Sequence, residues 1–495
     1  MNIGDLYVQF LPLVYPVKSN FTKWPPQFPN PATSLFWLTD TMTRIYPISA
    51  GSMCPVAALK TFLIQGTAMT DYTAPEPFEI CSIRPPTENS SITFRLTRNC
   101  HWNRCAFCPV YKLGAKYSRR TLDEVKADID RAKALDDLLF DHGIGTGFGG
   151  GNEYRRAAEL IDTIKAATGN YAMPRHSPLE DDDNLDDRSR WFLSWFRDVP
   201  TIEDSVYHLL SWRLSGGQTC FLGDADSLVL KPDFLKEVIA YIKPRFPTIQ
   251  RFTIYGRTRT AARQRSLKDL HEFRKAGLDR VHFGLESGCD EVLSLVNKGV
   301  TAAEHIEGCL KVKDAGLSCS VYVMPGLGGS ALSVRNAADT ARVLTAIGPD
   351  FIRIRSLEIF PRTPLEEMRD SGGFTEASEV EVVREIRTLV EHINCDTQLL
   401  SDSASNLLAV NGDLPDDRKR MLGVIDAYLA MALREKLEFS LRSRLESFLG
   451  QYGGPTEDII EAIRPMLKGS MLEFSRVSDG EIVAATRLIR GKLMP

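Results

Sequence analysis

Short apolar runs that alternate with amphipathic helical segments most limit the fold of this 495-residue chain. Six runs rich in β-branched and aromatic residues occupy 91–97, 218–226, 251–256, 280–286, 317–326 and 351–357. Helical patterns lie between them, at 122–139, 232–243, 266–276, 302–315 and 331–346. This alternation predicts βαβ units and a parallel sheet. Because six strands are too few for an eight-stranded barrel, we expect an α/β fold built as a partial (β/α)6 barrel.

Three regions depart from the alternating pattern. Residues 1–68 are rich in Pro, Asn and aromatic residues without a sustained period, which predicts a weakly structured extension and makes Met69 a plausible alternative start. We assign the barrel to residues 69–375, with a helical insertion at about 140–216. Residues 376–495 have a helical pattern and are expected to form a cap and tail.

The composition limits the class of protein. A hydrophobic content of 43% and a charged content of 25% are typical of globular proteins. The net charge of −4 gives no electrostatic reason to expect a nucleic-acid partner. No apolar run approaches the roughly 20 residues of a membrane helix, and the first residues lack a basic signal-peptide region. Ten cysteines in so long a chain do not suggest a disulfide framework, so we expect a cytoplasmic protein with no membrane partner.

The segment "RNCHWNRCAFCPVYK" at 98–112 places Cys100, Cys105 and Cys108 in a Cys-x4-Cys-x2-Cys pattern. A structural zinc site normally has four protein ligands. A [4Fe–4S] cube has four iron corners, and three cysteines would leave one iron open to a ligand that is not protein. The alternative is a zinc knuckle that takes His101 or a distant thiol as its fourth ligand.

Glycine and polar residues follow the predicted strands at the point where each ends. "GDAD" closes the second strand at 223–226, arginines follow the third, "GLESG" closes the fourth at 284–288, and "MPGLGG" closes the fifth at 324–329. In α/β barrels the carboxyl ends of the strands share one face, where ligands bind. With the cysteine loop after the first strand, five consecutive strand ends offer ligand-binding groups on that face.

These motifs resemble the radical S-adenosylmethionine (SAM) superfamily, and most of all its Elp3/MiaB/coproporphyrinogen-oxidase-like branch. The resemblance covers roughly residues 80–430. The common spacing in the family is Cys-x3-Cys-x2-Cys, so this loop has one more residue in its first gap. The resemblance implies that the three cysteines hold a [4Fe–4S] cluster and act in catalysis, while the open iron binds SAM.

The resemblance also implies the reaction and its partners. One-electron reduction of the cluster would cleave SAM to methionine and a 5′-deoxyadenosyl radical, which removes hydrogen from a substrate; the protein would orient the bond that breaks. The implied partners are an unidentified small-molecule substrate and an electron donor such as flavodoxin or ferredoxin. Whether SAM is consumed or regenerated does not follow from the motifs.

The resemblance implies two groups of SAM contacts at the adenine and amino ends. Phe107 is expected to line the adenine, with Val323, Met324 and Gly326 bordering it. The segment after the second strand stands where the family receives the SAM amino group, and a carboxylate there can accept hydrogen bonds from it. Its residues are Gly223, Asp224, Ala225 and Asp226.

The remaining implied contacts lie at the fourth strand end and beyond it. Glu286 and Ser287 stand where relatives meet the ribose or methionine portion, although Glu286 could also be a structural cap. Lys298 resembles the basic residue that pairs with the SAM carboxylate, and Arg257 is a rival for that role. Lys298 could instead be an ordinary surface residue at a helix end.

Other features have simpler interpretations. Five scattered cysteines are read as small buried hydrophobic residues rather than an auxiliary cluster: Cys220, Cys289, Cys309, Cys319 and Cys395. The G-x-G-x-x-G pattern at 145–150 follows a helix rather than a strand, so it is read as a hinge and not as a dinucleotide site. The acidic run at 180–187 is read as a solvated loop.

The sequence thus favours a radical SAM enzyme. An iron–sulfur electron carrier or scaffold would not need SAM-shaped strand ends. An RNA-modifying Elp3/MiaB-type enzyme would carry an acetyltransferase or small β-barrel module, and nothing after residue 375 resembles either. A cobalamin-dependent methyltransferase would carry a preceding cobalamin domain, for which residues 1–90 are too short.

Overall fold

The computed structural model describes residues 75–81, 83–110, 112, 116–147, 152–168, 200–401, 403–452, 455–469 and 471–493. The extension at 1–68 and the acidic run at 180–187 lie outside these residues. The central sheet contains β1 (Ile92–Arg95), β4 (Thr219–Gly223), β5 (Arg251–Gly256), β6 (Leu278–Glu286), β7 (Ser318–Val323), β8 (Phe351–Ile354), β9 (Thr397–Leu400) and β10 (Gly412–Leu414).

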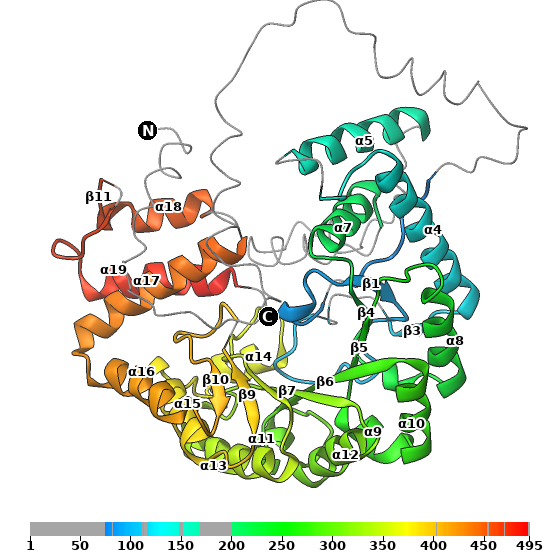
Figure 1. Ribbon diagram of the computed structural model, residues 1–495. Coiled ribbons are helices and arrows are strands. Elements are labelled where there is room, and N and C mark those ends of the chain that lie inside the picture. The colour runs from blue at the N-terminus through cyan, green and yellow to red at the C-terminus, as the bar shows by residue number, and fades with distance from the viewer. Residues whose placement is uncertain are drawn as a thin grey trace, which may run out of the picture.

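The sheet is an open barrel rather than a closed one (Figure 1). Its strand order is β1-β4-β5-β6-β7-β8-β9-β10, and within the described residues β1 and β10 are its two edges. Neighbouring strands from β1 to β9 run parallel, whereas β10 runs antiparallel to β9. The parallel sheet and the open barrel confirm the predicted fold class.

Two strands, β9 and β10, lie beyond residue 375, where the sequence predicted only helices. The prediction is wrong there because the two strands, of four and three residues, contain only one β-branched residue between them, Thr397. Neither carries the long β-branched run that marks a buried parallel strand. Their consequence for the site is a loop after β9 that the sequence did not reveal.

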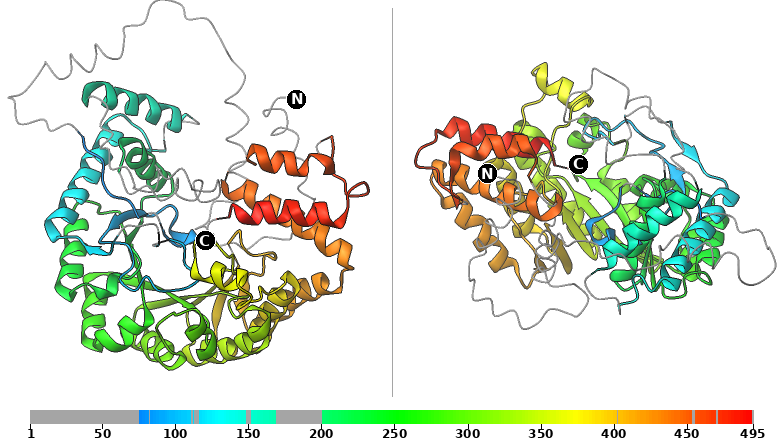
Figure 2. Two further views of the ribbon diagram at one scale, coloured as in Figure 1. Left: turned by 180° about the vertical axis from the view of Figure 1, so that it is seen from behind. Right: turned by 90° about the horizontal axis from the view of Figure 1, so that it is seen from above.

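Helices cover the outer face of the sheet (Figures 1 and 2). The strand side chains that face them, such as Leu222, Ile254, Phe283 and Ile352, are fully buried in one core cluster. Capping residues fix the helix ends, as in the Ser266–Asp269 capping box. These helices are α8 (Pro232–Ile242), α9 (Thr258–Gln264), α10 (Leu267–Ala276), α12 (Ala302–Asp314), α13 (Gly329–Ile347), α15 (Glu379–His392) and α16 (Arg418–Ala430). Two further helices, α11 (Asp290–Leu295) and α14 (Pro364–Asp370), instead pack with the cysteine loop in a separate apolar cluster.

α4 (Leu122–Asp141) precedes the insertion, and α5 (Glu153–Thr168) and α7 (Ile202–Leu214) lie in its described part. They lie beside the β1 edge (Figure 1). α4 begins at a capping box made by Thr121 and Glu124. The expected helical character of 140–216 therefore holds for the parts that the structure describes.

The last helices form a unit with its own core at the other side of the barrel mouth (Figure 2). Arg490 joins this unit to the barrel, since its Nε lies 2.9 Å from a carboxylate oxygen of Glu358 and its Nη2 lies 2.9 Å from Glu376. No helix among the described residues has the length and apolar character needed to cross a bilayer. The unit contains α17 (Leu433–Tyr452), α18 (Glu457–Ile463), β11 (Leu467–Lys468), β12 (Met471–Leu472) and α19 (Asp479–Gly491).

Candidate functional site

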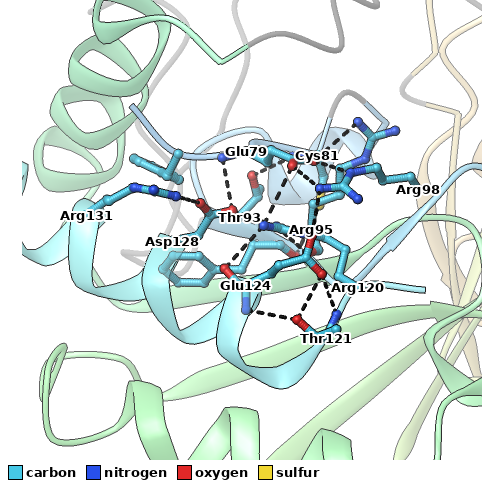
Figure 3. Close-up of polar contacts among 12 residues, drawn as sticks. Glu79, Cys81, Thr93, Arg95, Arg98, Arg120, Thr121, Glu124, Asp128 and Arg131 are labelled. Carbon is cyan, nitrogen blue, oxygen red and sulfur yellow. Dashed lines mark hydrogen bonds and ion pairs between the residues drawn. The ribbon is translucent and has the colours of Figure 1, made fainter. Parts of the chain in front are cut away.

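The cysteine loop leaves the sheet at the carboxyl end of β1 and is closed at its base by a two-stranded ribbon. This ribbon pairs β2 (Thr97–Arg98) with β3 (Ser118–Arg119) in antiparallel register. An ion-pair network holds the ribbon against α4 (Figure 3). Arg98 Nε donates to Glu79 Oε2 at 2.9 Å, and Arg120 Nη1 donates to Asp128 Oδ2 at 2.6 Å. Both ends of the loop are therefore fixed to the barrel.

The loop also docks on the turn that follows α11. The Ala106 amide donates to the Val296 carbonyl at 2.8 Å, and the Trp102 indole Nε1 donates to the Asn297 carbonyl at 2.9 Å. Arg257 Nη2 donates to the Lys298 carbonyl at 2.6 Å. The turn thus connects the cysteine loop to the ends of β5 and β6.

One cavity collects the three cysteine thiols and five strand ends. It encloses about 1250 Å³ of space, counting the open solvent at its mouth. Residues after β4, β5, β6, β7 and β8 line it together with Cys100, Cys105 and Cys108. The grouping of strand-end motifs on one face, which the sequence predicted, is therefore present in the fold.

The three cysteines share one cavity, as the ligands of an iron–sulfur cube would. Burial raises the pKa of Cys105 and raises that of Cys108 to about 12, so their thiolates need a cation nearby. Among the described residues, no three His, Cys, Asp or Glu side chains converge on a point where one ion could bind. A cube takes each thiolate on a separate iron, so its ligands need a shared cavity rather than a common point. His101, the proposed zinc partner, instead has its Nδ1 3.7 Å from Asp226.

Glu286 and Lys298 form an ion pair in the cavity wall. Lys298 Nζ lies 3.0 Å from Glu286 Oε1, and both side chains are 11% exposed. Burial lowers the pKa of Lys298, but the charges of Glu286 and Cys105 and the hydrogen bond to Glu286 together outweigh it, so the net shift is upward. Glu286 has a φ of 68°, and Lys298 Nζ lies 5.6 Å from the Phe107 ring centroid. The structure therefore places Lys298 inside the site and not on the outer surface.

Half of the predicted SAM contacts lie in the cavity wall. Those that line it, besides the cysteines, are Phe107, Ala225, Arg257, Glu286, Lys298 and Met324. The cavity lining does not include the other predicted residues, namely Gly223, Asp224, Asp226, Ser287, Val323 and Gly326. The roles of both groups in SAM binding stay predictions.

The two carboxylates of "GDAD" have structural partners. Asp224 Oδ2 accepts hydrogen bonds from Arg95 Nε at 2.9 Å and from the Asn99 amide at 3.0 Å. Asp226 Oδ1 accepts from the Arg257 amide at 3.1 Å, and burial raises the pKa of Asp226 to about 6. Asp224 thus holds the start of the cysteine loop and Asp226 holds the backbone of Arg257. Ala225, which lies between them in the sequence, lines the cavity.

The sequence missed several lining residues. Tyr255, Tyr322 and Arg355 come from β5, β7 and the segment after β8, and burial raises the pKa of Tyr255. Period-2 alternation could have placed both tyrosines on the inner face of the sheet. Ser405 follows β9, and the next residue, Asn406, accepts from the Ser356 amide at 2.9 Å. No sequence signal marked this loop, because β9 itself was not predicted.

Comparison with known proteins identifies a domain. The model of the radical SAM superfamily matches residues 185–340. The chain therefore contains a radical SAM domain. The matched range contains the ends of β4 to β7, and the structure joins these ends to the cysteine loop in one cavity. The superfamily uses a [4Fe–4S] cluster and SAM.

Two curated relatives support the predicted branch. A tRNA uridine(34) acetyltransferase of Methanocaldococcus infernus is 29% identical over 122 residues, or 24% of this chain and 23% of that protein. The corresponding Methanocaldococcus jannaschii protein is 27% identical over 117 residues, or 23% of this chain and 22% of that protein. The chain thus spans less than a quarter of the length of these relatives.

Among solved structures, the archaeal Methanocaldococcus infernus Elp3 gives a TM-score of 0.33 at 19% identity, over 43% of this chain and 53% of that chain. Methylornithine synthase gives a TM-score of 0.33 at 14% identity, over 64% of each chain.

Proposed function

We propose that the chain is a radical SAM enzyme that cleaves SAM reductively and abstracts hydrogen from an as yet unidentified substrate. The observation that carries the proposal is the single cavity in which three cysteine thiols meet the ends of β4 to β8. A structure built only to carry electrons would need no such ligand-binding wall. When bound, the cluster and SAM would supply the electron transfer and the group that accepts the hydrogen atom.

The residues of this chain would bind, orient and shield the reactants. Cys100, Cys105 and Cys108 would hold three irons of the cluster, and their loop is fixed at its base and at the turn after α11. The cavity wall carries a negative charge on Glu286 and a positive charge on Lys298. The amino acid portion of SAM also carries one positive and one negative charge, and each would pair with the opposite charge in the wall. The segment after β8 and the loop after β9 would form the substrate side.

Anaerobic reconstitution of the full chain followed by reduction with dithionite tests the proposal. We expect cube-type absorption and formation of 5′-deoxyadenosine from SAM, with both lost in Cys105→Ala. The matched control is Cys395→Ala, because Cys395 lies outside the cavity lining. If the wild type binds iron as a cube yet forms no deoxyadenosine, the enzyme proposal is wrong. If deoxyadenosine does form, deuterium transfer into it from labelled candidate metabolites would identify the substrate.

An enzyme that acts on RNA is a second candidate. The curated relatives are tRNA uridine(34) acetyltransferases, and exposed cations flank the cysteine loop at Arg104, Lys116 and Arg119. These residues oppose the expectation of no nucleic-acid partner, which rested on the net charge and on the lack of a recognisable RNA-binding module after residue 375. Filter binding of total tRNA tests this candidate. Binding that falls in Arg104→Glu would support it, whereas binding unaffected by that change would count against it.

A further inference from the structure

Behind the cavity wall, α15 carries a buried carboxylate that pairs with no cation among the described residues. Glu385 is 3% exposed. Its Oε2 accepts hydrogen bonds from the Gly326 amide at 3.1 Å and from Asn336 Nδ2 at 2.8 Å, while its Oε1 accepts from Ser333 Oγ at 2.7 Å. All of its donors are neutral groups on other elements. Burying a carboxylate without a cation lowers the stability of the fold unless hydrogen bonds replace its lost hydration. The three hydrogen bonds of Glu385 are therefore important for the elements that they join.

These hydrogen bonds continue to a second strand end. Ser287 Oγ, directly after β6, donates to Asn336 Oδ1 at 2.6 Å. Asn336 lies on α13 and is 2% exposed. A continuous path of side-chain hydrogen bonds therefore runs from Gly326, beyond β7, through Glu385 and Asn336 to Ser287.

On the cavity side the same two strand ends are joined directly. The Met324 amide donates to the Glu286 carbonyl at 2.8 Å. Both of these residues line the cavity, and Glu286 holds Lys298. The two strand ends are thus braced twice, by a backbone bond in front and by Glu385 and Asn336 behind.

We propose that Glu385 is a positioning residue whose hydrogen bonds to Gly326 and Asn336 hold the ends of β7 and β6, and thereby fix Met324 and Glu286 for SAM binding. This inference rests on the proposed function in that SAM is the ligand. Glu385 does not line the cavity, so its carboxylate acts only through the strand ends. Burial with three neutral donors, and with no cation in the described part of the chain, is what such a positioning role requires.

Glu385→Ala and Glu385→Gln separate positioning from charge. A glutamine oxygen can still accept from both N–H groups, and its amide nitrogen can face Ser333 Oγ. In the reconstituted full chain, we expect Glu385→Ala to raise the Kd for isotope-labelled SAM roughly tenfold and Glu385→Gln to change it by less than about twofold. Iron content should not change in either variant. Glu391→Ala, at an exposed carboxylate of the same helix, is the matched control.

Amide hydrogen exchange gives a readout that needs neither cluster nor SAM. Loss of Glu385 should accelerate exchange at Gly326 directly and at Met324 through the loosened strand ends. A merely local role would change Gly326 alone. Should Glu385→Ala not fold, Ser287→Ala breaks the same path at its other end and should raise the Kd about threefold.

Two results would overturn the inference: a folded Glu385→Ala with wild-type SAM affinity and wild-type exchange at Met324, or a Glu385→Gln as impaired as Glu385→Ala. If the wild-type chain binds no SAM, the proposed function fails. The exchange of Met324 in the metal-free chain still decides whether Glu385 positions the strand ends.

Discussion

Gly299 lies where the cysteine loop meets the turn after α11, and Gly299→Ala should loosen that contact. Its φ of 67° is in the left-handed region, and a Cβ there would fall within the van der Waals radius of the Trp102 ring. Trp102 lies between Cys100 and Cys105, and its indole donates to the Asn297 carbonyl at 2.9 Å. The substitution therefore displaces a residue that docks the cysteine loop on the turn after α11.

Two costs add in this variant. A side chain in the left-handed region costs about 1–2 kcal/mol. Moving Trp102 loses a hydrogen bond of about 1 kcal/mol and part of its packing. We therefore expect Gly299→Ala to lose roughly 2–4 kcal/mol of unfolding free energy, which is the sum of these contributions with some packing loss.

Gly316 provides the matched control, since it has a φ of 76° but no atom lies within 4 Å of the position that an alanine Cβ would take. Gly316→Ala should show only the backbone cost of about 1–2 kcal/mol and should keep its iron. Urea unfolding of the metal-free chains and iron retention after reconstitution measure both effects. If the two variants lose equal stability and retain iron equally, Trp102 does not transmit strain to the cysteines.

Three further predictions concern buried charges. Lys298→Met leaves Glu286 without its cation in a wall where both side chains are 11% exposed, and we expect a loss of about 3 kcal/mol in urea unfolding. Arg490→Met removes the nearer of two cations beside Glu358, whose carboxylate also lies 3.7 Å from Arg444 Nη1, and should cost about 2 kcal/mol by the same assay. Burial raises the pKa of Glu385 from 4.5 to about 7, so the folded chain holds this proton more tightly than the unfolded chain. Wild-type stability should therefore fall as pH rises from about 4.5 to 7, and Glu385→Gln should lack that loss.

Exposed cations give the controls for the charge variants. Lys275 has a side chain that is 75% exposed, and Lys275→Met should change stability by less than about 0.5 kcal/mol. Arg487→Met, at an exposed position on the same helix as Arg490, should also be nearly neutral. Equal losses in buried and exposed variants would mean that burial does not set the cost, and a parallel pH dependence in wild type and Glu385→Gln would refute the assignment to Glu385.

The alternating pattern of the sequence was enough to predict the sheet, because each parallel strand is a short apolar run between amphipathic helices. The same rule placed the cysteine loop and the glycine-rich motifs on one face, where the cavity lies. It failed at Thr397–Leu400, where the strand carries only one β-branched residue and no aromatic residue. The loop after that strand, including Ser405, was therefore invisible to sequence reasoning.

Side-chain direction was the second limit. The motif at the end of β4 predicted Asp224 and Asp226 as contacts, but both carboxylates bond to neighbouring protein groups and only Ala225 lines the cavity. A motif gives the place of a residue along the chain, whereas its partners come from other elements. For the same reason no sequence pattern pointed to Glu385, whose donors lie 49 to 59 positions away.

The electron paramagnetic resonance spectrum of the reduced, reconstituted chain, recorded with and without SAM, shows whether the fourth iron is open. If three cysteines hold the cube and leave that iron free, the cluster signal should shift when SAM is added, and Cys105→Ala should show no such signal. A cube signal that SAM leaves unchanged would mean that the fourth iron has a protein ligand, and the chain would then not bind SAM as proposed.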